Sequence, residues 1–245
     1  MYPDKKIISK LTGVDTVAFR EIGSTNDIAK EMAKSRACDA KIIIAANQTG
    51  GHGRGDRSFF CYDGGLYMSL IVPDSRATLP PELITSGAAA AVCRAVRAAT
   101  GAQVTIKWVN DLYLSGRKIC GILALRADSA YIVGIGINVR PVHFPDDIRA
   151  TAAALGSGCD LNILAADVAR EVLSAMTESA DSVIEYCRRN SFTLGKTVTY
   201  ERNGVQYEGI AEKLFPDGSL GVTLQNGSID IVSSGEISVK TKKSI

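Results

Sequence analysis

The sequence predicts an α+β fold in two parts, a larger domain over residues 1–190 and a small β-rich domain over residues 191–245. In the larger part, apolar runs of strand length alternate with helical segments. In the smaller part, Asn-Gly and Pro-Asp-Gly turn signals separate short alternating strands. About fifty residues of that kind are typical of a small closed barrel.

The first helix is predicted by its own start signal. The segment GSTNDIAKEMAKS, residues 23–35, offers Ser24 or Thr25 as an N-cap and Asp27 for the first turn. Apolar side chains spaced for one helical face follow the cap. These are Ile28, Met32 and Ala33.

The remaining elements follow from apolar runs and the residues that interrupt them. KIIIAA at 41–46 and GLYMSLIV at 65–72 predict buried strands, and Pro81 can open an alanine-rich helix that ends near residue 99. An antiparallel meander is expected from 104–108, 119–125 and 130–139, with LYLSGRK and RADS as the separators. A second helical region is expected over about 162–189. Its predicted core contacts are Ile163, Val168, Val172, Met176 and Ile184.

Composition excludes several classes of protein. The net charge is +2 with no basic stripe, so we expect no nucleic-acid partner. Six cysteines at wide spacings, without a C-x-x-C, favour reduced thiols over disulfides or a zinc site. The N-terminus has no long apolar segment, and no apolar stretch approaches a membrane span. We therefore expect a cytoplasmic protein with no membrane partner.

Several catalytic motifs are absent. There is no G-x-x-x-x-G-K-[ST] and no G-x-G-x-x-G, which argues against a P-loop and a dinucleotide fold. With only His52 and His143, histidine metal clusters and a serine triad are disfavoured. Positive charge and backbone amides remain as the groups that can carry chemistry.

The segment TGGHGRGDRSF, residues 49–59, fits that role. Its glycines let consecutive N–H groups point into one concavity, where they can bind an anion. Arg54 and Arg57 can then clamp a phosphate or a carboxylate in bidentate fashion. The same composition also fits a solvated surface loop.

A second cluster is expected around KWVND, residues 107–111. A hairpin here brings Lys107, Asp111 and Lys118 together, a set that can bind a polyanion with its Mg²⁺. Ordinary surface lysines on a hairpin are the alternative. Further on, GIGINV at 134–139 has two glycines on one strand face, which indicates either a close approach by another group or a bulge. Gly121 permits the same two interpretations.

Taken together and in order, these segments resemble the biotin protein ligases. The matching motifs are Ser24-Thr25-Asn26, Gln48-Thr49 with the loop at 50–57, KWVND, Lys118 before CGIL, GIGINV, and GEISV at 235–239. The resemblance covers nearly the whole chain. It implies a biotin/lipoate-ligase-like catalytic domain, with a mixed sheet flanked by helices, and an SH3-like C-terminal barrel.

The resemblance also implies a two-step reaction. ATP and biotin give biotinyl-5′-adenylate and pyrophosphate, and a lysine of a biotin carboxyl carrier protein then takes the biotinyl group. Fixed cations are needed because the first step brings two anions together. The implied catalytic residues are Arg54, Lys118 and Lys107, with Mg²⁺ on the triphosphate near Asp111 or Asn138.

Binding roles are carried over by matching position. The implied biotin-binding residues are Ser24, Thr25, Asn26, Gln48, His52, Gly53, Arg54, Lys118, Gly121, Gly134 and Gly136. The implied ATP and adenylate-binding residues are Arg54, Arg57, Phe59, Lys107, Asn110 and Asn138, and the implied metal-binding residue is Asp111. The glycines at 121, 134 and 136 would leave room for the ring and tail of biotin, and Phe59 would stack on adenine.

Three positions depart from the family pattern. His52 stands for an arginine, Asp56 for a glycine, and Val109 for the proline of K-W-P-N-D. Because Arg54 and both lysines remain, we expect an active enzyme with altered retention of the adenylate.

Other functions compete with the ligase. A lipoate or octanoate ligase belongs to the same superfamily, but a lipoyl chain gives the polar Ser-Thr-Asn and Gln48 groups nothing to bond. A biotin-responsive repressor carries an N-terminal helix-turn-helix, and about twenty residues before the first motif leave no room for one. A non-catalytic biotin-binding module is the third alternative. Because family members often pair through sheet edges, a homodimer is among the expected states.

Overall fold

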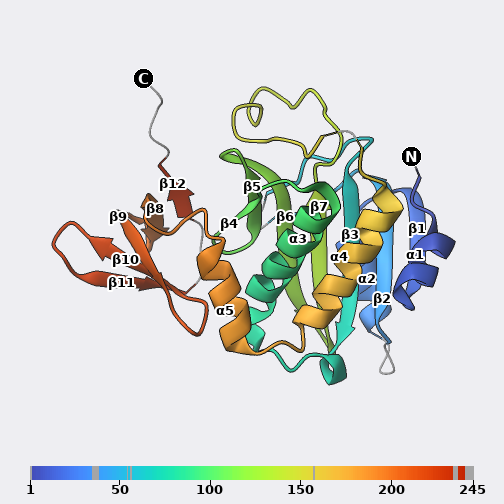
Figure 1. Ribbon diagram of the computed structural model, residues 1–245, viewed down its shortest axis with the longest axis horizontal. Helices are drawn as coiled ribbons and strands as arrows, with labels where there is room; N and C mark the ends of the chain where they lie inside the picture. The colour runs from blue at the N-terminus through green and yellow to red at the C-terminus, as the bar shows by residue number, and fades with distance from the viewer. Residues whose placement is uncertain are drawn as a thin grey trace.

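The computed structural model describes residues 2–34, 39–53, 55, 57–156, 158–233 and 237–240. It places a large mixed sheet with helices on both faces beside a smaller antiparallel sheet formed by the C-terminal strands (Figure 1). The helices are α1 Lys5–Thr12, α2 Thr25–Ala33, α3 Ile84–Thr100, α4 Leu161–Ala175 and α5 Ala180–Arg189. None of the helices within these ranges is both long and apolar enough to cross a membrane.

Seven strands form the large sheet in the order β1-β2-β3-β7-β6-β5-β4. Their bounds are β1 Asp15–Ile22, β2 Lys41–Gln48, β3 Leu66–Pro73, β4 Thr105–Lys107, β5 Asp111–Leu114, β6 Arg117–Ala127 and β7 Ala130–Ile137. β1 and β2 run parallel, and all the other neighbours are antiparallel. The sheet is therefore mixed, as the resemblance implied.

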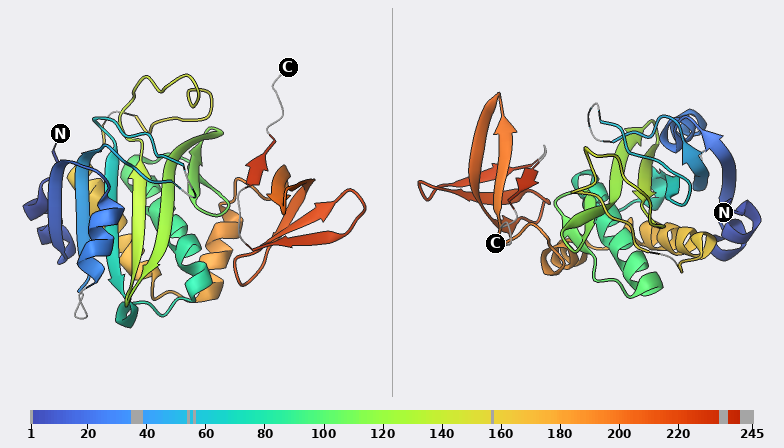
Figure 2. Two further views of the ribbon diagram at one scale, coloured as in Figure 1. Left: turned by 180° about the vertical axis from the view of Figure 1, so that it is seen from behind. Right: turned by 90° about the horizontal axis from the view of Figure 1, so that it is seen from above.

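The two faces of this sheet are covered by different helices. Helices α3 and α4 pack on one face, where the alternate side chains Ile42 and Ile44 of β2 point, and α2 packs on the other face, where Ile43 points (Figures 1 and 2). Burial on both sides explains why the strands appear in the sequence as continuous apolar runs. On β3 and β7, Ser69, Gly134 and Gly136 share the α2 face, because neighbouring residues of a strand point to opposite faces.

Most predicted elements are confirmed, with three corrections. The separator LYLSGRK contains strand β5, so the meander has four strands instead of three. The region 162–189 is two helices, because Ser179 caps a new start for α5. Ile163 is wrong as a core residue, since its side chain is 52% exposed. The other four predicted core residues of this region are buried.

The C-terminal part is a five-stranded antiparallel sheet in the order β11-β10-β9-β8-β12. Its strands are β8 Thr197–Arg202, β9 Val205–Leu214, β10 Leu220–Leu224, β11 Ile229–Val232 and β12 Ile237–Val239. The predicted small β-domain is confirmed, and Gly204, Gly218 and Gly227 have the positive φ that their turns require. Closure into a barrel is not seen in the described strands, because β11 and β12 are unpaired edges there. The boundary between residues 190 and 191 stays a prediction.

The two sheets are joined through Trp108 at the end of the β4 hairpin. Its Nε1 donates to the carbonyl of Gly218 at 2.9 Å, and its backbone N–H donates to Thr193 Oγ1 at 3.0 Å. Arg188 of α5 donates to the carbonyl of Leu214. These bonds hold the β-domain at one end of the large sheet, beside strand β4 (Figure 2).

Candidate active site

A cavity of about 410 Å³ lies on the α2 face of the large sheet, between the first turn of α2, the glycine-rich loop and the β4–β6 meander. Most residues that the sequence singled out meet there. Those lining it are Ser24, Thr25, Asn26, Gln48, His52, Gly53, Arg57, Phe59, Lys107, Asn110, Asp111, Lys118, Gly121, Gly134 and Gly136. Elements from residue 24 to residue 136 thus converge on one volume.

Among the described residues, one predicted site residue, Asn138, is not part of this lining. Arg54, the first predicted catalytic residue, lies outside the described residues, as does Asp56. Asn138 is buried beyond the end of β7, where its Nδ2 donates to the carbonyl of Ala153 at 3.0 Å. The predicted role of Asn138 in holding adenylate has no support from this position, although its Oδ1 is buried without a hydrogen-bond partner among the described residues.

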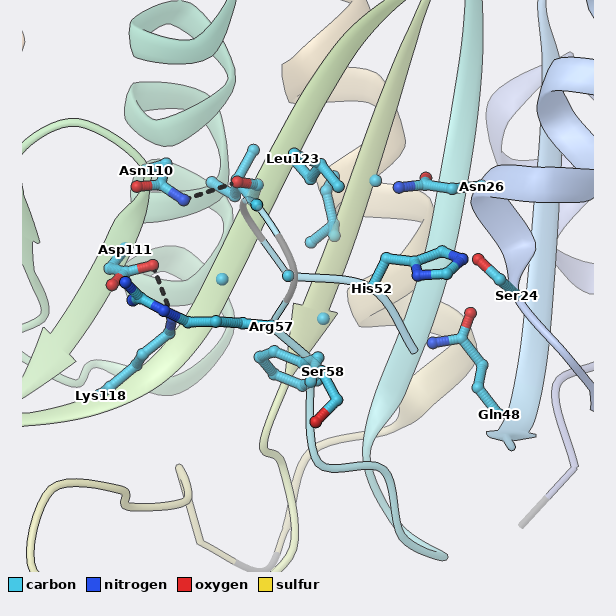
Figure 3. Close-up of a pocket in the computed structure, with 18 of the residues that line it drawn as sticks. Ser24, Asn26, Gln48, His52, Arg57, Ser58, Asn110, Asp111, Lys118 and Leu123 are labelled. Carbon is cyan, nitrogen blue, oxygen red and sulfur yellow. Dashed lines mark hydrogen bonds and ion pairs between the residues drawn. The ribbon is translucent and has the colours of Figure 1, made fainter. Parts of the chain in front are cut away.

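The cavity has a neutral, hydrogen-bonding end (Figure 3). Ser24, Thr25 and Asn26 open helix α2 and are buried, and Gln48 ends strand β2 beside them. Gln48 Oε1 accepts from the backbone N–H of Thr25 at 2.7 Å and lies 3.0 Å from Thr25 Oγ1. Because a backbone N–H can only donate, this contact fixes the amide orientation of Gln48.

The opposite end of the cavity is cationic. Lys107 and Asp111 face each other across the β4–β5 hairpin, as the sequence predicted, and Lys118 Nζ lies 2.7 Å from Asp111 Oδ1. Arg57 extends from the loop towards Asp111 and Lys118 (Figure 3). Burial lowers the pKa of Lys107; Asp111 opposes that shift, while Lys118 and Arg57 add to it. Among the described residues, this end carries three cationic side chains and one carboxylate, a balance that attracts an anion.

The described flanks of the glycine-rich loop pair with each other at the edge of the cavity. The Gly53 N–H donates to the Arg57 carbonyl at 2.7 Å, and the Phe59 N–H donates to the Gly51 carbonyl at 2.8 Å. A Cβ on Gly51 would come within 2.8 Å of Cys61 Sγ, so glycine is needed for this close approach. The loop is therefore built into the site, which favours the binding-loop interpretation over a solvated surface loop.

The strand glycines admit neighbouring side chains rather than forming a bulge. β6 and β7 pair in continuous register, with Gly121 opposite Gly136. A Cβ on Gly136 would lie 2.7 Å from Cε1 of Phe59, and one on Gly134 would overlap the carboxamide of Asn26. The space that the family resemblance implied for the ring and tail of biotin is thus partly filled by Phe59 and Asn26. Phe59 lies on this glycine surface with Lys118 Nζ 6.0 Å from its ring centre.

Some lining residues were not predicted as site residues. These are Gly55, Ser58, Trp108, Ile122, Leu123, Ile135 and Ile237. Leu123 could have been predicted as a site residue from the sequence, because it stands two residues after Gly121 and therefore on the same face of the strand. Ile237 has none, since it reaches the cavity from the C-terminal sheet through packing of the two parts.

A metal site can be tested against the side chains present. Among the residues described, no three acidic, histidine or cysteine side chains gather into a metal-binding group. The carboxylate of Asp111 faces the cavity beside Asn110, whose Nδ2 donates to the carbonyl of Ile122 at 2.9 Å, so that its Oδ1 is left over. One carboxylate and one amide oxygen fit a Mg²⁺ ion that arrives on nucleotide phosphates, because Mg²⁺ takes most of its ligands from phosphate and water.

Comparisons with known proteins agree with this geometry. Residues 18–141 match the model of the biotin/lipoate A/B protein ligase family, about half of the chain. The bifunctional ligase/repressor BirA of Bacillus subtilis is 37% identical over 174 residues, which cover 67% of this chain and 53% of that protein. This chain spans about half the length of that relative and of its Bacillus spizizenii counterpart.

Other relatives match over more of their length. The biotin–[acetyl-CoA-carboxylase] ligase of Mycobacterium tuberculosis is 28% identical over 91% of this chain and 88% of its own. A biotin protein ligase structure from Aquifex aeolicus, in complex with biotin and ATP, matches with a TM-score of 0.80 over 92% of this chain and 98% of that one, at 23% identity. At that identity the structural match establishes the fold. From the family model and this fold, the chain belongs to the biotin/lipoate A/B protein ligase family.

Proposed function

We propose that this chain is an ATP-dependent biotin–protein ligase. It would activate biotin as biotinyl-5′-AMP and transfer the biotinyl group to a lysine of a biotin carboxyl carrier protein. The observation that carries the proposal is the two-ended cavity, with neutral hydrogen-bonding groups from α2 and Gln48 at one end and Lys107, Lys118 and Arg57 at the other. Biotin joins a cyclic urea to a carboxylate, and the two ends match those groups in kind.

The first step joins two anions. A carboxylate oxygen of biotin attacks the α-phosphorus of ATP, a new P–O bond forms, and the bond to the β-phosphate breaks with release of pyrophosphate. Lys118 and Lys107 would offset the repulsion between the carboxylate and the phosphates, because fixed cations in a site shielded from water stabilise developing charge. Arg54, which is not among the described residues, is proposed to act with them.

Mg²⁺ is proposed to enter with the triphosphate. Asp111 and the Oδ1 of Asn110 are the groups that would hold it, and the ion would neutralise phosphate charge when bound.

The second step needs no covalent enzyme intermediate. The amine of the carrier lysine attacks the acyl carbon of the adenylate, the amide bond forms, and AMP leaves. The glycine-rich loop supports this step by covering the mixed anhydride, which water would otherwise hydrolyse. The name of the Mycobacterium tuberculosis relative, a biotin–[acetyl-CoA-carboxylase] ligase, supports a carboxylase carrier as partner.

The neutral end favours biotin over lipoate. Thr25, Asn26 and Gln48 offer several hydrogen-bonding groups within one buried corner. A dithiolane ring offers no partner to the donors and acceptors that these residues leave free for a ligand, and a site built to hydrogen-bond its substrate strongly rejects an analogue that lacks the polar group.

Biotin-dependent exchange of pyrophosphate into ATP, with Mg²⁺ present, tests the proposal. Wild type is compared with Lys118→Ala and Arg54→Ala, and lipoate is added as a competitor. We expect exchange that requires biotin, ignores lipoate and falls in both variants. Wild type that binds biotin in calorimetry but shows no exchange would instead identify a binding module, and competition by lipoate would identify a lipoate ligase.

A further inference from the structure

Strand β3 carries one polar side chain in the middle of an apolar run. Ser69 lies within LYMSLIVP, where every residue is buried, and its own side chain is fully buried. A buried hydroxyl is unfavourable unless it is hydrogen-bonded. The chain could place an alanine or a valine here at no such cost, so the partners of Ser69 indicate what the hydroxyl does.

Both partners of Ser69 belong to the neutral end of the cavity. Its Oγ lies 2.8 Å from Thr25 Oγ1 and 2.6 Å from Asn26 Oδ1. Ser69 itself is not among the cavity-lining residues; it stands behind them, on the face of β3 that α2 covers. Its neighbour in register on β7 is Gly134, whose missing side chain makes room for the carboxamide of Asn26. That carboxamide is therefore held between Gly134 and the Ser69 hydroxyl.

The hydrogen bonds among Ser69, Thr25 and Asn26 determine which of these side chains can donate to a ligand and which can accept from one. A carbonyl oxygen only accepts, so the single hydroxyl hydrogen of Ser69 goes to Asn26 Oδ1. Asn26 then presents its Nδ2 hydrogens as donors, and its side chain points into the cavity (Figure 3). The hydroxyl of Thr25 has oxygen partners in Ser69 and in Gln48 Oε1, so its hydrogen is used inside the protein with either one. Towards a ligand, Thr25 Oγ1 is left as an acceptor.

The hydrogen bonds of Gln48 likewise determine which of its groups can face a ligand. Its Oε1 is held by the backbone N–H of Thr25, so its Nε2 is the group that remains for other contacts, one of them with Cys61 Sγ at 3.5 Å. The corner thus offers amide donors from Asn26 and Gln48 together with a hydroxyl acceptor from Thr25. A cyclic urea has the complementary pattern, a carbonyl that accepts beside N–H groups that donate.

We propose that Ser69 is a positioning residue that fixes the donor and acceptor pattern of the neutral end, and that it thereby sets selectivity for a cyclic urea. The inference rests on the proposed function and extends it to a residue that does not touch the ligand. Without the Ser69 hydroxyl, Asn26 can rotate its amide and Thr25 can redirect its hydrogen, so the pattern is no longer unique.

The test compares Ser69→Ala, Ser69→Thr and Ser86→Ala with wild type. Ser86 is a matched control, because it is also a buried serine but lies in α3 and does not line the cavity. Calorimetry measures the affinity for biotin and for a tetrahydrothiophene valerate, which keeps the thioether ring and tail but lacks the urea. Pyrophosphate exchange measures KM for biotin and kcat.

We expect Ser69→Ala to weaken biotin binding and raise its KM about tenfold, the effect of losing about 1.4 kcal/mol of fixed hydrogen bonding, with kcat nearly unchanged. Affinity for the analogue without the urea should stay constant, so the selectivity ratio falls by the same factor. Ser69→Thr keeps the hydroxyl and should have the selectivity ratio of wild type, and Ser86→Ala should leave that ratio unchanged.

Two results overturn the inference in different ways. If wild type binds no biotin and exchanges no pyrophosphate, the proposed function fails and the inference fails with it. If wild type is active but Ser69→Ala keeps the selectivity of Ser86→Ala, or weakens both ligands equally, the inference alone is wrong.

Discussion

Asp27 ties the glycine-rich loop to helix α2, because its Oδ2 lies 2.9 Å from Nε2 of His52. Asp27 directly follows the Ser24–Asn26 corner, and His52 lines the cavity above it. Burial would raise the pKa of Asp27, but hydrogen bonds to His52 and to Lys30 outweigh burial and lower it. His52 stands at the position where the family resemblance expects an arginine, and its contact with Asp27 fastens the start of the loop to helix α2.

Breaking this contact should loosen the loop without unfolding the protein. We expect Asp27→Ala to release biotinyl-adenylate about two- to fivefold faster, since a half-exposed pair contributes up to about 1 kcal/mol. Asp27→Asn keeps a hydrogen-bond acceptor, so its release rate should lie between those of Asp27→Ala and wild type. Release is measured by chasing labelled adenylate from the preloaded enzyme.

Glu31→Ala provides the control for Asp27→Ala. It removes an exposed ion pair with Lys34 on the same helix, away from the loop. Equal release rates in Asp27→Ala and Glu31→Ala would show that the loop is not held by His52. The lowered pKa also sets the acid limit of the effect: the Asp27 carboxylate is present above the ordinary carboxyl pKa, and its contribution is lost as pH falls through the lowered value.

Lys118 serves two functions that one substitution removes together. Its Nζ pairs with the half-buried Asp111 and lies at the cationic end of the cavity. We expect Lys118→Ala to lower biotin-dependent exchange about 10²- to 10³-fold, because a fixed positive charge is lost and an unpaired carboxylate is left beside the phosphates. Lys213→Ala, at an exposed position of β9, should leave exchange unchanged. Similar rates in the two variants would exclude Lys118 from the chemistry.

Gly134 should be the least tolerant of the cavity glycines. A Cβ there would overlap the carboxamide of Asn26, whose Oδ1 is held by the Ser69 hydroxyl on β3. We expect Gly134→Ala to abolish measurable biotin binding in calorimetry while leaving a folded protein by circular dichroism. Gly23→Ala is the control, since a Cβ at Gly23 meets nothing within 4 Å and Gly23 directly precedes the same corner. Undiminished binding by Gly134→Ala would contradict the placement of Asn26.

Local patterns predicted the part of the site that depends on short-range structure. The hairpin of Lys107, Asp111 and Lys118 follows from strand spacing. The start of helix α2 follows from its N-terminal signal, although Ser24 at the N-cap makes no side-chain capping hydrogen bond, and the place of this corner in the site came from the family resemblance. Strand β1, an edge strand with only Thr16 buried in it, has no apolar run to reveal it. Ile163 is apolar but lies on the exposed face of α4 with Arg170 and Ser174, one position away from the helical period of the buried residues, so an apolar side chain alone did not identify the core face.

Long-range packing accounts for what the sequence did not reveal. The clearest case is Ser69, which looks like an interruption in an apolar strand until β3 is placed under helix α2. Ile237 is a second case, because it lines the cavity only where the C-terminal sheet docks beside β4. No periodicity within β3 or β12 carries that information, since both contacts depend on how separate elements meet.

The lowered pKa of Lys107 should make the proposed binding of ATP depend on pH. Burial is the main cause of the shift, so the ammonium is present below the lowered pKa and is lost as pH rises through it, at a value below 10.5. Phosphates favour the charged form, so we expect ATP affinity to fall on the alkaline side and ATP binding there to take up protons. Calorimetry in buffers of different ionisation enthalpy measures this uptake.

Lys107→Met should remove the proton uptake and flatten the alkaline limb. The same shift makes the stability of wild type rise with pH where ATP affinity falls. Between the lowered pKa of Lys107 and its ordinary pKa, the unfolded chain binds more protons than the folded protein, so the free energy of unfolding rises with pH in that range. Lys107→Met should lose this rise. Identical alkaline profiles for wild type and the variant would assign the titration to another group.

Trp108 should stabilise the junction between the two sheets, because its Nε1 donates to the carbonyl of Gly218 across the interface. Trp108→Phe keeps an aromatic ring but leaves that buried carbonyl without its donor, so we expect the free energy of unfolding to fall by about 1–3 kcal/mol. Tyr2→Phe removes a hydrogen bond of the same 2.9 Å length, to the carbonyl of Ala18, from a half-exposed side chain and should cost far less. Urea unfolding followed by circular dichroism measures both, and equal losses would mean that the Trp108–Gly218 hydrogen bond stabilises the junction no more than an exposed hydrogen bond would.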